Sequence, residues 1–238
     1  GKTVTVAGLT ISGADYTNYI LTQPTTTANI TPKELTVTGV TANNRVYDGT
    51  TSASVSGGTV SALGSDSVSL SSANATFGDK NVGTGKAVTT AYTLSGTDAA
   101  NYSLVQASGL TADITAKALT ASYTGTNKTY DATTTAGVTG SSSDIVSGDT
   151  VTFSQSAAFA DKNVGNAKAV TISGLALSGA DAGNYTVTDA SNVTAAISAK
   201  PITATGIVAL DKVYDASTSA TLDHTGATLT SGASSATD

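Results

Sequence analysis

The stretch Arg45–Thr51, "RVYDGTT", decides the fold because it returns twice along the chain. It reappears as "KTYDATT" at Lys128–Thr134 and as "KVYDAST" at Lys212–Thr218, and the three tyrosines lie 83 and 84 residues apart. A fixed period of this length is typical of tandem copies of one structural unit. The chain of 238 residues therefore predicts repeated modules rather than one large domain.

Two other phrases keep the same period and order. "GADYTNY", "GTDAANY" and "GADAGNY" begin at Gly13, Gly96 and Gly179, and "TANITPK", "TADITAK" and "TAAISAK" end at Lys33, Lys117 and Lys200. The period predicts two complete β repeats, residues 33–116 and 117–199. Residues 1–32 are then the C-terminal part of a preceding repeat, and residues 200–238 are the N-terminal part of a following repeat.

The register of the units has one alternative. Units that begin at Gly1, Gly85 and Asn166 would fit nearly three copies into the chain. We prefer the boundary at Lys33 because Pro32 and Pro201 both lie near it.

The local pattern predicts β-strands. Val4 and Val6 alternate with threonines, as do Leu35 and Val37, and this period of two is a strand signal. No stretch shows a helical stripe, and turn residues recur every 8–12 residues. We therefore expect an all-β fold of tandem small β-sandwich (Ig-like) modules in an extended rod, each with six to eight strands and no helix longer than two turns. The alternative is a β-grasp-like module with one short helix.

A one-residue difference between copies predicts a β-bulge. "VTVAGLTIS" and "VTISGLALS" have nine residues, whereas the middle copy "VTTAYTLS" has eight. Alternation holds in the short copy and slips at Gly8 and Gly174 in the long ones. An extra residue beside a glycine in a strand is typical of a bulge, which is a feature of the fold and not of a site.

The phrases "FGDKNVG" at Phe77–Gly83 and "FADKNVG" at Phe159–Gly165 predict a tight turn between two core anchors, Phe77/Phe159 and Val82/Val164. The aspartate can accept a hydrogen bond from the backbone N–H two residues on. The last glycine is kept in both copies, which indicates positive φ there, whereas Gly78 is replaced by Ala160 and needs none. The functional alternative is an Asp–Asn cluster that binds a hard cation.

The phrase "YD[GA][TS]T" predicts a structural turn. Each tyrosine has a large apolar body, and Asp48, Asp131 and Asp215 stand where an Asx-turn begins. Gly49 is replaced by alanine in the other copies, which indicates that positive φ is not required. A ligand-binding aromatic residue is the alternative.

The motif "GxDxxNY" places an aspartate four residues before a tyrosine in each copy. Immunoglobulin-like domains have a similar arrangement, the tyrosine corner, in which the tyrosine bonds to upstream backbone. This similarity favours a sandwich.

Composition excludes several classes of function. The net charge is −6 without a basic cluster, which argues against nucleic-acid binding, and no apolar run approaches the ~20 residues of a membrane span. Because the chain has no cysteine, disulfides and thiol sites are excluded.

Catalytic chemistry is hard to build from this chain. His224 and Glu34 are the only residues of their types, and neither recurs in the repeats. Asp144 and Asp149 could pair as glycosidase acids, but one of them would need an apolar pocket, which their Ser/Gly-rich surroundings do not suggest. We therefore predict no enzyme activity, no catalytic, cofactor-binding or metal-binding residues, and no cofactor.

Taken together, "VYDGTT", "FGDKNVGTGKAV", "LSGTDAANY" and "ADITAKALT" resemble the YDG-type repeats of large secreted bacterial adhesins of the filamentous-haemagglutinin, two-partner secretion kind. The likeness covers essentially the whole chain and departs at Ala132 and Ala216. It implies export through an outer-membrane secretion partner, an extracellular location on the bacterial cell surface, and a part in attachment or biofilm formation. It implies no catalytic or cofactor residues.

Two functions follow as hypotheses. The first is a structural stalk or spacer in an adhesin or adhesive fibre, whose partners are neighbouring repeats in the same chain and other chains of the fibre. The second is a binding module for a glycan or host receptor, such as a cell-surface or matrix polysaccharide. A third reading, ice or crystal-surface binding through rows such as Thr36/Thr38, competes with ordinary exposed strand threonines.

Overall fold

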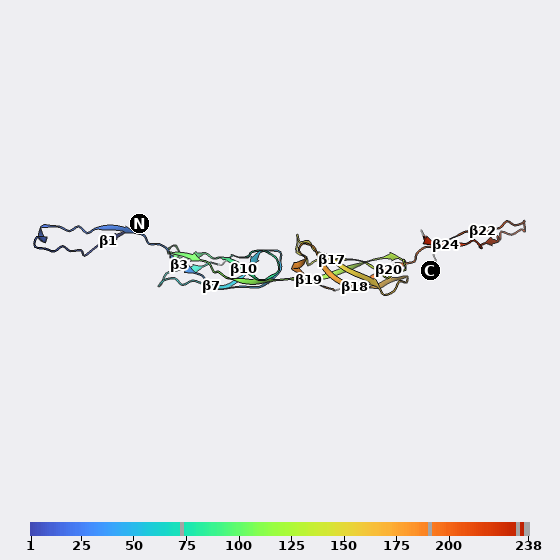
Figure 1. The fold of residues 1–238 in the computed structure, drawn as a ribbon, viewed down its shortest axis with the longest axis horizontal. Helices are drawn as coiled ribbons and strands as arrows, with labels where there is room; N and C mark the ends of the chain where they lie inside the picture. The colour runs from blue at the N-terminus through green and yellow to red at the C-terminus, as the bar shows by residue number, and fades with distance from the viewer. Residues whose placement is uncertain (72–73, 190–191, 232–233, 236–238) are drawn as a thin grey trace. The chain divides into compact units, whose positions relative to one another are not determined.

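The computed structural model describes residues 1–71, 74–189, 192–231 and 234–235. It is all-β (Figure 1), and among these residues the only helical turns are of 3-10 type and three residues long: η1 (Tyr16–Asn18), η2 (Ala99–Asn101) and η3 (Ala182–Asn184). No helix in the described part of the chain is both long and apolar enough to cross a membrane. The all-β prediction and the limit on helix length are confirmed. We call residues 33–116 and 117–199 the first and second modules, and residues 1–32 and 200–238 the N-terminal and C-terminal half-modules.

The first module places its strands in one five-stranded sheet and three strand pairs. The sheet has the order β5-β13-β10-β9-β6, and the pairs are β12-β3, β4-β7 and β11-β8. The strands are β3 (Lys33–Thr36), β4 (Thr38–Ala42), β5 (Arg45–Val46), β6 (Ser52–Ala53), β7 (Val55–Thr59), β8 (Ser69–Leu70), β9 (Asn74–Phe77), β10 (Gly83–Ala91), β11 (Leu94–Ser95), β12 (Tyr102–Val105) and β13 (Thr111–Thr115).

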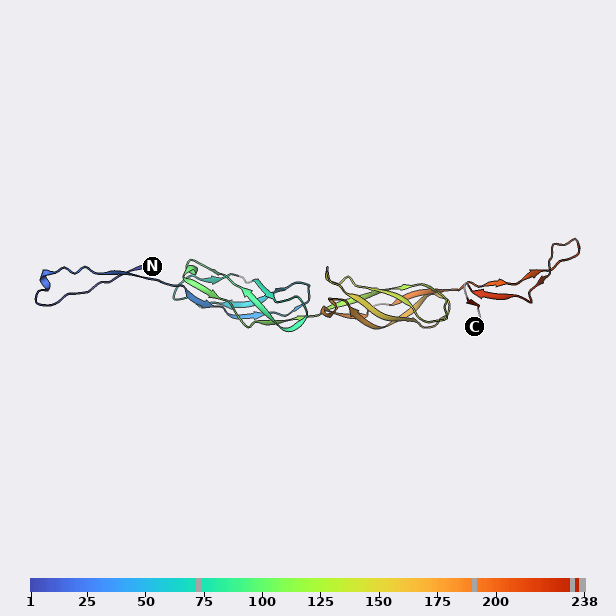
Figure 2. The same cartoon turned by 45° about the horizontal axis from the view of Figure 1, so that its top comes forward.

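The second module has the same plan with longer strands. A four-stranded sheet, β15-β20-β18-β17, accompanies a three-stranded sheet, β16-β14-β19. Figure 2 shows the twist of these sheets. The strands are β14 (Lys117–Thr126), β15 (Lys128–Thr129), β16 (Gly137–Ser141), β17 (Thr152–Phe159), β18 (Gly165–Ser178), β19 (Tyr185–Asp189) and β20 (Val193–Ser198).

Two parallel pairings join the opening and closing parts of each module. The opening strand runs parallel to the strand that follows the 3-10 turn, with Lys33 opposite Tyr102 and Lys117 opposite Tyr185. The short strand before the tyrosine phrase runs parallel to the last strand of the module. Parallel strands are joined by a long stretch of intervening chain, and the local period-two pattern therefore does not reveal which strands pair.

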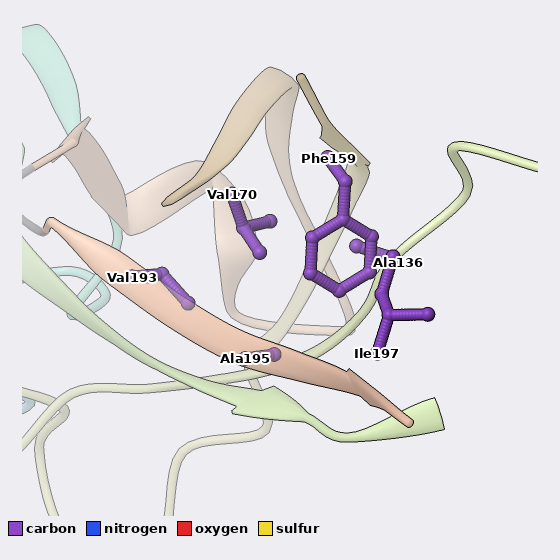
Figure 3. Close-up of a cluster of buried hydrophobic side chains, with 6 residues drawn as sticks. All are labelled: Ala136, Phe159, Val170, Val193, Ala195 and Ile197. Atoms are coloured by element: carbon purple, nitrogen blue, oxygen red, sulfur yellow. The ribbon is translucent and has the colours of Figure 1, made fainter. Parts of the chain in front are cut away.

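The core of the second module contains a cluster of buried apolar side chains from β17, β18 and β20 (Figure 3), and Tyr130 packs against this cluster. Phe159, Val170 and Ile197 are buried there, with Ala136, Val193 and Ala195 beside them. Leu119 and Ala121 on β14 are also fully buried. The sequence alternates these small and branched residues with threonine and serine, which stay exposed on the other face of each strand.

The predicted β-bulge is confirmed on β18. Ser154 lies opposite Ala176 and Ser156 lies opposite Ser173, so β18 has one more residue than β17 between these pairs. Gly174 takes a positive φ of 64°, and its counterpart Gly8 has φ 82°. In the short copy, burial alternates without a slip from Val88 to Leu94.

Each half-module forms a local hairpin with the pairing register of a module. The N-terminal half-module contains β1 (Lys2–Thr5) and β2 (Thr25–Ala28), which pair antiparallel. The C-terminal half-module pairs its strands as β21-β24-β25 and β22-β23. Its strands are β21 (Thr203–Thr205), β22 (Val208–Ala209), β23 (Leu222–Asp223), β24 (Thr228–Ser231) and β25 (Ser234–Ser235).

Candidate functional site

Polar side chains gather at two places in each module, and both are built from the repeated phrases. One surrounds the phrase at Tyr47 and Tyr130, next to the last strand of the module. The other surrounds the 3-10 turn before Tyr102 and Tyr185, next to the first strand of the module. We call them the cation corner and the loop clasp.

The cation corner of the first module is organised by Arg45. Its guanidinium donates to Asp48 Oδ1 at 2.5 Å, to Thr50 Oγ1 at 3.0 Å and to the Thr50 carbonyl. The carboxylate of Asp48 also accepts from Thr50 N–H at 2.9 Å, which is the predicted Asx-turn. The guanidinium carbon lies 5.2 Å from the ring centre of Phe77. The cation is therefore held between loop oxygens and the face of an aromatic ring.

The second module repeats this arrangement with a lysine. Lys128 Nζ donates to Asp131 Oδ1 at 2.7 Å, to the Thr133 carbonyl and to the Thr135 carbonyl, and it lies 5.7 Å from the ring centre of Phe159. Asp131 Oδ1 accepts from Thr133 N–H at 3.0 Å, so this Asx-turn is also confirmed.

A second cation covers the tyrosine of each corner. Lys80 Nζ lies 5.8 Å from the ring centre of Tyr47, and Lys162 Nζ lies 6.0 Å from that of Tyr130. Tyr47 is fully buried and Tyr130 is half-buried. These tyrosines are therefore packing residues and not an exposed aromatic platform for a ligand.

The turn "F[GA]DKNVG" is confirmed as a turn. Asp79 Oδ1 accepts from Asn81 N–H at 2.8 Å and from Lys86 Nζ at 2.7 Å, and Asp161 repeats both bonds with Asn163 and Lys168. The lysine thus contacts the carboxylate at which the alternative reading placed a cation. Among the described residues, no three His, Cys, Asp or Glu side chains form a group that could hold a metal ion.

Two details of the turn prediction were wrong. Phe77 and Phe159 are buried, but Val82 is only half-buried and Val164 is 56% exposed, because the turn carries the valine away from the core. Gly83 and Gly165 do not take positive φ. A Cβ at either position would lie 3.2 Å from the side chain of the lysine that reaches back to the aspartate, a close contact that glycine avoids.

The prediction that the Gly49 position does not need positive φ was also wrong. The backbone is left-handed in all three copies, with φ 79° at Gly49, 65° at Ala132 and 59° at Ala216. The same is true of Gly85 and Ala167, at 58° and 51°. Alanine in this region carries strain of about 1–2 kcal/mol that glycine avoids.

We therefore expect Ala132→Gly to stabilise the second module by about 0.5–1 kcal/mol. Relief of the left-handed strain outweighs the greater freedom of glycine in the unfolded chain. Chemical denaturation of the variant and the wild type measures the difference. The reverse change Gly49→Ala should destabilise the first module, and equal stability of all three proteins would contradict the assignment of strain.

The loop clasp joins the 3-10 turn to a loop more than thirty residues upstream. Asp98 Oδ2 accepts from Ser67 N–H at 2.8 Å. The Tyr102 hydroxyl donates to Asp66 Oδ2 at 2.6 Å and accepts from Leu63 N–H at 3.0 Å. The hydrogen bond to Asp66 raises the pKa of Tyr102.

The second module has the same clasp. Asp181 Oδ2 accepts from Thr150 N–H at 2.9 Å, and the Tyr185 hydroxyl bonds to Asp149 Oδ2 at 2.7 Å and to Val146 N–H at 3.0 Å. The tyrosine hydroxyl therefore bonds to upstream backbone, as in a tyrosine corner. Its partner, however, lies in a loop 39 residues upstream, whereas in a tyrosine corner the partner lies only a few residues upstream. This loop was missed, although an aspartate precedes the tyrosine by 36 residues in both copies.

The remaining candidate residues are not brought together. Asp149 is bonded to Tyr185, and Asp144 Oδ2 accepts from Thr120 N–H at 3.1 Å, so each of the two candidate glycosidase acids has a structural partner. His224 is exposed in a turn between β23 and β24, and Glu34 is exposed on β3. The arrangement positions loops and provides no assembled set of reacting groups among the described residues.

The corner makes the second module sensitive to acid. Hydrogen bonds from Lys128 Nζ and then from Thr133 lower the pKa of Asp131 from 3.8 to about 2. Asp131 binds a proton at higher pH in the unfolded state than in the folded state. The stability that the charged carboxylate adds to the module is therefore complete above about pH 5 and is lost as the pH falls towards 2. Hydrogen bonds from Lys168 and Asn163 lower the pKa of Asp161 in the same direction.

We expect the melting temperature of the second module to fall as the pH is lowered from about 5 to about 2. The melting temperature of the Asp131→Asn variant should fall less over the same range. The difference between wild type and variant should be constant above about pH 5 and should close near pH 2. Thermal unfolding monitored by circular dichroism at a series of pH values tests this. A difference that does not change with pH would mean that the ion pair adds no stability.

One comparison with known proteins gives a match. The model of the YDG domain family matches residues 31–109 and again residues 115–193. No curated protein matches the chain. No solved structure matches it either.

Proposed function

The chain belongs to the YDG domain family, and we propose that its modules are structural stalk or spacer repeats of an extracellular bacterial adhesin or adhesive fibre that supports attachment or biofilm formation. The observation that carries this proposal is the repetition of both polar assemblies, at equivalent positions, in the two modules. If one module bound a receptor, we would expect a surface cluster that the other module lacks. The cation corner and the loop clasp instead occur in both modules, and they hold loops together inside each of them.

The proposed architecture is a tandem array of sandwich-like modules in a semi-rigid rod. The two sheets of the second module support a sandwich, and the parallel pairings support the β-grasp-like alternative. A single residue, Ala116, separates β13 from β14, and so short a connection favours a stiff junction. Each module would then contact only its neighbours, as in other repeat arrays.

The location and partners belong to the same proposal. Export through an outer-membrane secretion partner and display on the cell surface agree with the absence of cysteine, because such a chain cannot be locked by disulfides during passage. Contact with neighbouring repeats and with other chains of a fibre is the proposed mode of association. No catalytic role is proposed.

Small-angle scattering tests the spacer function. A globule of this length has a radius of gyration of about 18 Å. Strands of about 8–10 residues make each module about 30 Å long. A rod of nearly three module lengths would then be about 100 Å long, and its radius of gyration would be about 30 Å. A value near that of the globule would refute the rod.

The alternative, a glycan- or host-receptor-binding module, is favoured by the exposed hydroxyl pairs that cross neighbouring strands. Thr76 and Thr89 lie 3.0 Å apart through their Oγ1 atoms, and the hydroxyls of Thr152 and Ser178 lie 2.7 Å apart. A glycan array probed with the folded chain separates the two functions. Saturable binding that is lost on unfolding would support the binding module, and its absence would support the spacer.

A further inference from the structure

The opening and closing parts of each complete module lie side by side. We call residues 33–47 of the first module and 117–130 of the second the opening segments. The closing segments are residues 102–115 of the first module and, within the described part of the chain, residues 185–189 and 192–198 of the second. In each module the two segments run parallel and pair near both of their ends. The chain between them forms the rest of the module.

The two segments of the first module keep one register along their length. Lys33 lies opposite Tyr102 where β3 pairs with β12. Arg45 lies opposite Ile114 where β5 pairs with β13. The partners are separated by the same number of residues at both places. The strands β3, β4 and β5 therefore follow a single course along the module, and β12 and β13 follow a parallel course beside it.

The second module has the same pairing with a longer first ladder. β14 and β19 pair over five residues, beginning with Lys117 opposite Tyr185, whereas β3 and β12 pair over four. At the other end, β15 pairs with β20, with Lys128 opposite Ile197. Each segment is also anchored to the rest of the module, because β14 pairs with β16 and β20 pairs with β18. A pull on either segment is therefore passed on to a neighbouring strand.

A side-chain bond and a close backbone approach connect the segments between the two ladders. Asn127 lies in the break between β14 and β15, and its Oδ1 accepts from Ala196 N–H at 2.7 Å. Asn44 makes the equivalent bond in the first module. At Gly125 a Cβ would lie 2.5 Å from the Thr194 carbonyl oxygen, so the two backbones approach each other directly. Figure 3 shows β20 with the green ribbon of β14 beside it.

Apolar side chains from both segments are buried in the core. Leu119 on the opening segment is completely buried, and Ile197 on the closing segment is 1% exposed. In the first module, Leu35 and Ile114 are 3% and 1% exposed. Water is therefore kept from the core side of this pairing, and hydrogen bonds are electrostatically stronger away from water.

We propose that the paired opening and closing segments are a mechanical clamp, so that each module resists a force that pulls its two ends apart. Such a force acts on the first residue of the opening segment and on the last residue of the closing segment. Because the segments are parallel, they would have to slide past each other in opposite directions. The hydrogen bonds lie across the strands and would carry this load together, whereas a hairpin pulled open at its ends breaks one pair after another.

The clamp would protect the whole module under tension. The other strands are folded from the chain between the two segments, so the force reaches them only after the segments have separated. The use of this resistance in a cell rests on the proposed spacer function, because only a fibre under load needs it. The resistance itself is a property of the module and can be measured without reference to that function.

Single-molecule force spectroscopy of the full chain tests the clamp. The chain has no cysteine, so introduced pairs define the points at which it is pulled. Ala116→Cys/Lys200→Cys loads the second module through its ends. Thr152→Cys/Ser178→Cys loads the open end of the β17–β18 hairpin, where these two residues lie opposite each other.

We expect a several-fold higher unfolding force through the ends than across the hairpin at the same pulling speed. The event through the ends should lengthen the chain by about 250 Å, because about 80 residues become extended. This length identifies the event as unfolding of the complete module.

Variants identify the bonds that bear the load. Asn127→Ala removes the bond from Ala196 N–H and should lower the unfolding force through the ends. Asn127→Asp keeps an acceptor oxygen at the same place and should retain most of the force. Asp161→Ala is the control, because it removes turn bonds from Asn163 and Lys168, which lie outside both segments. It should lower the equilibrium stability but not the force, since a contact that is still intact when the segments separate does not change the rate of forced unfolding.

The outcomes separate the possibilities. A higher force through the ends, lowered by Asn127→Ala and not by Asp161→Ala, supports the clamp. A force through the ends that is no higher than the force across the hairpin would overturn it, as would an equal loss of force in the two variants. The comparison of pulling directions changes no residue of the clamp, so it decides the question even if Asn127→Ala fails to fold. A compact radius of gyration would refute the spacer function and leave these forces unchanged, so the two proposals fail separately.

Discussion

Phe159→Ala is expected to lower the free energy of unfolding of the second module by about 3–5 kcal/mol, the usual cost of removing a buried phenylalanine. The ring is 3% exposed and packs in the cluster with Val170 and Ile197 (Figure 3). It also supplies the face over which Lys128 lies. The variant therefore loses packing and a cation–π contact at once, and a module of this size has little stability to spare.

The repeat supplies matched controls for this variant. Phe77→Ala should have the same effect on the first module because Phe77 is equally buried and lies beneath Arg45. Val164→Ala should change stability by less than about 0.5 kcal/mol, since its side chain is mostly exposed. Calorimetry of each variant should show one transition shifted and one unchanged. A single transition that shifts as a whole would mean that the modules do not unfold independently.

Gly96→Ala is expected to destabilise the first module by about 3 kcal/mol. Gly96 has φ +113°, a conformation that costs a side chain about 1–3 kcal/mol, and the new Cβ would lie 2.1 Å from the Ser67 carbonyl oxygen. Relief of this contact must push the loop away and break the bond from Ser67 N–H to Asp98. The loop clasp would open as a result.

Two glycines separate strain from contact. At Gly78 a Cβ meets nothing within 4 Å and the φ is ordinary, so Gly78→Ala should be nearly neutral, as the natural Ala160 in the other copy suggests. Gly179→Ala should repeat the large effect in the second module, because a Cβ there would lie 2.5 Å from the Thr150 carbonyl oxygen. Denaturant unfolding of the three variants measures these effects. A neutral Gly96→Ala would show that the loop adjusts without cost.

The half-modules separate the pairing of strands from the burial of apolar side chains. Their strands pair locally in the module register, yet their tyrosines and isoleucines stay exposed. Local hydrogen bonding is therefore encoded within each half, and burial requires the other half. It agrees with the marginal stability of an isolated hairpin in water.

The sequence by itself determined the repeat, the β class, the turns and the bulge. These features are local: alternation over a few residues gives strands, an aspartate bonds to the N–H two residues on, and an extra residue beside Gly174 shifts the pleat. The recurrence of "YDG" and its relatives at a fixed spacing was enough to identify the family that the domain model also matches.

Only the tertiary structure decided which distant segments meet. The parallel pairing of Lys33 with Tyr102, the bond from Tyr102 to Asp66 and the position of Arg45 over Phe77 each join residues about 30 to 70 positions apart, and no local pattern marks such partners. The positive φ of Ala132 could not be predicted from its residue type, because alanine disfavours the left-handed region. The hydrogen bonds of the turn, such as that from Thr133 N–H to Asp131, hold Ala132 in that conformation. Contacts between distant segments placed the cation of the corner over its aromatic ring and built the loop clasp.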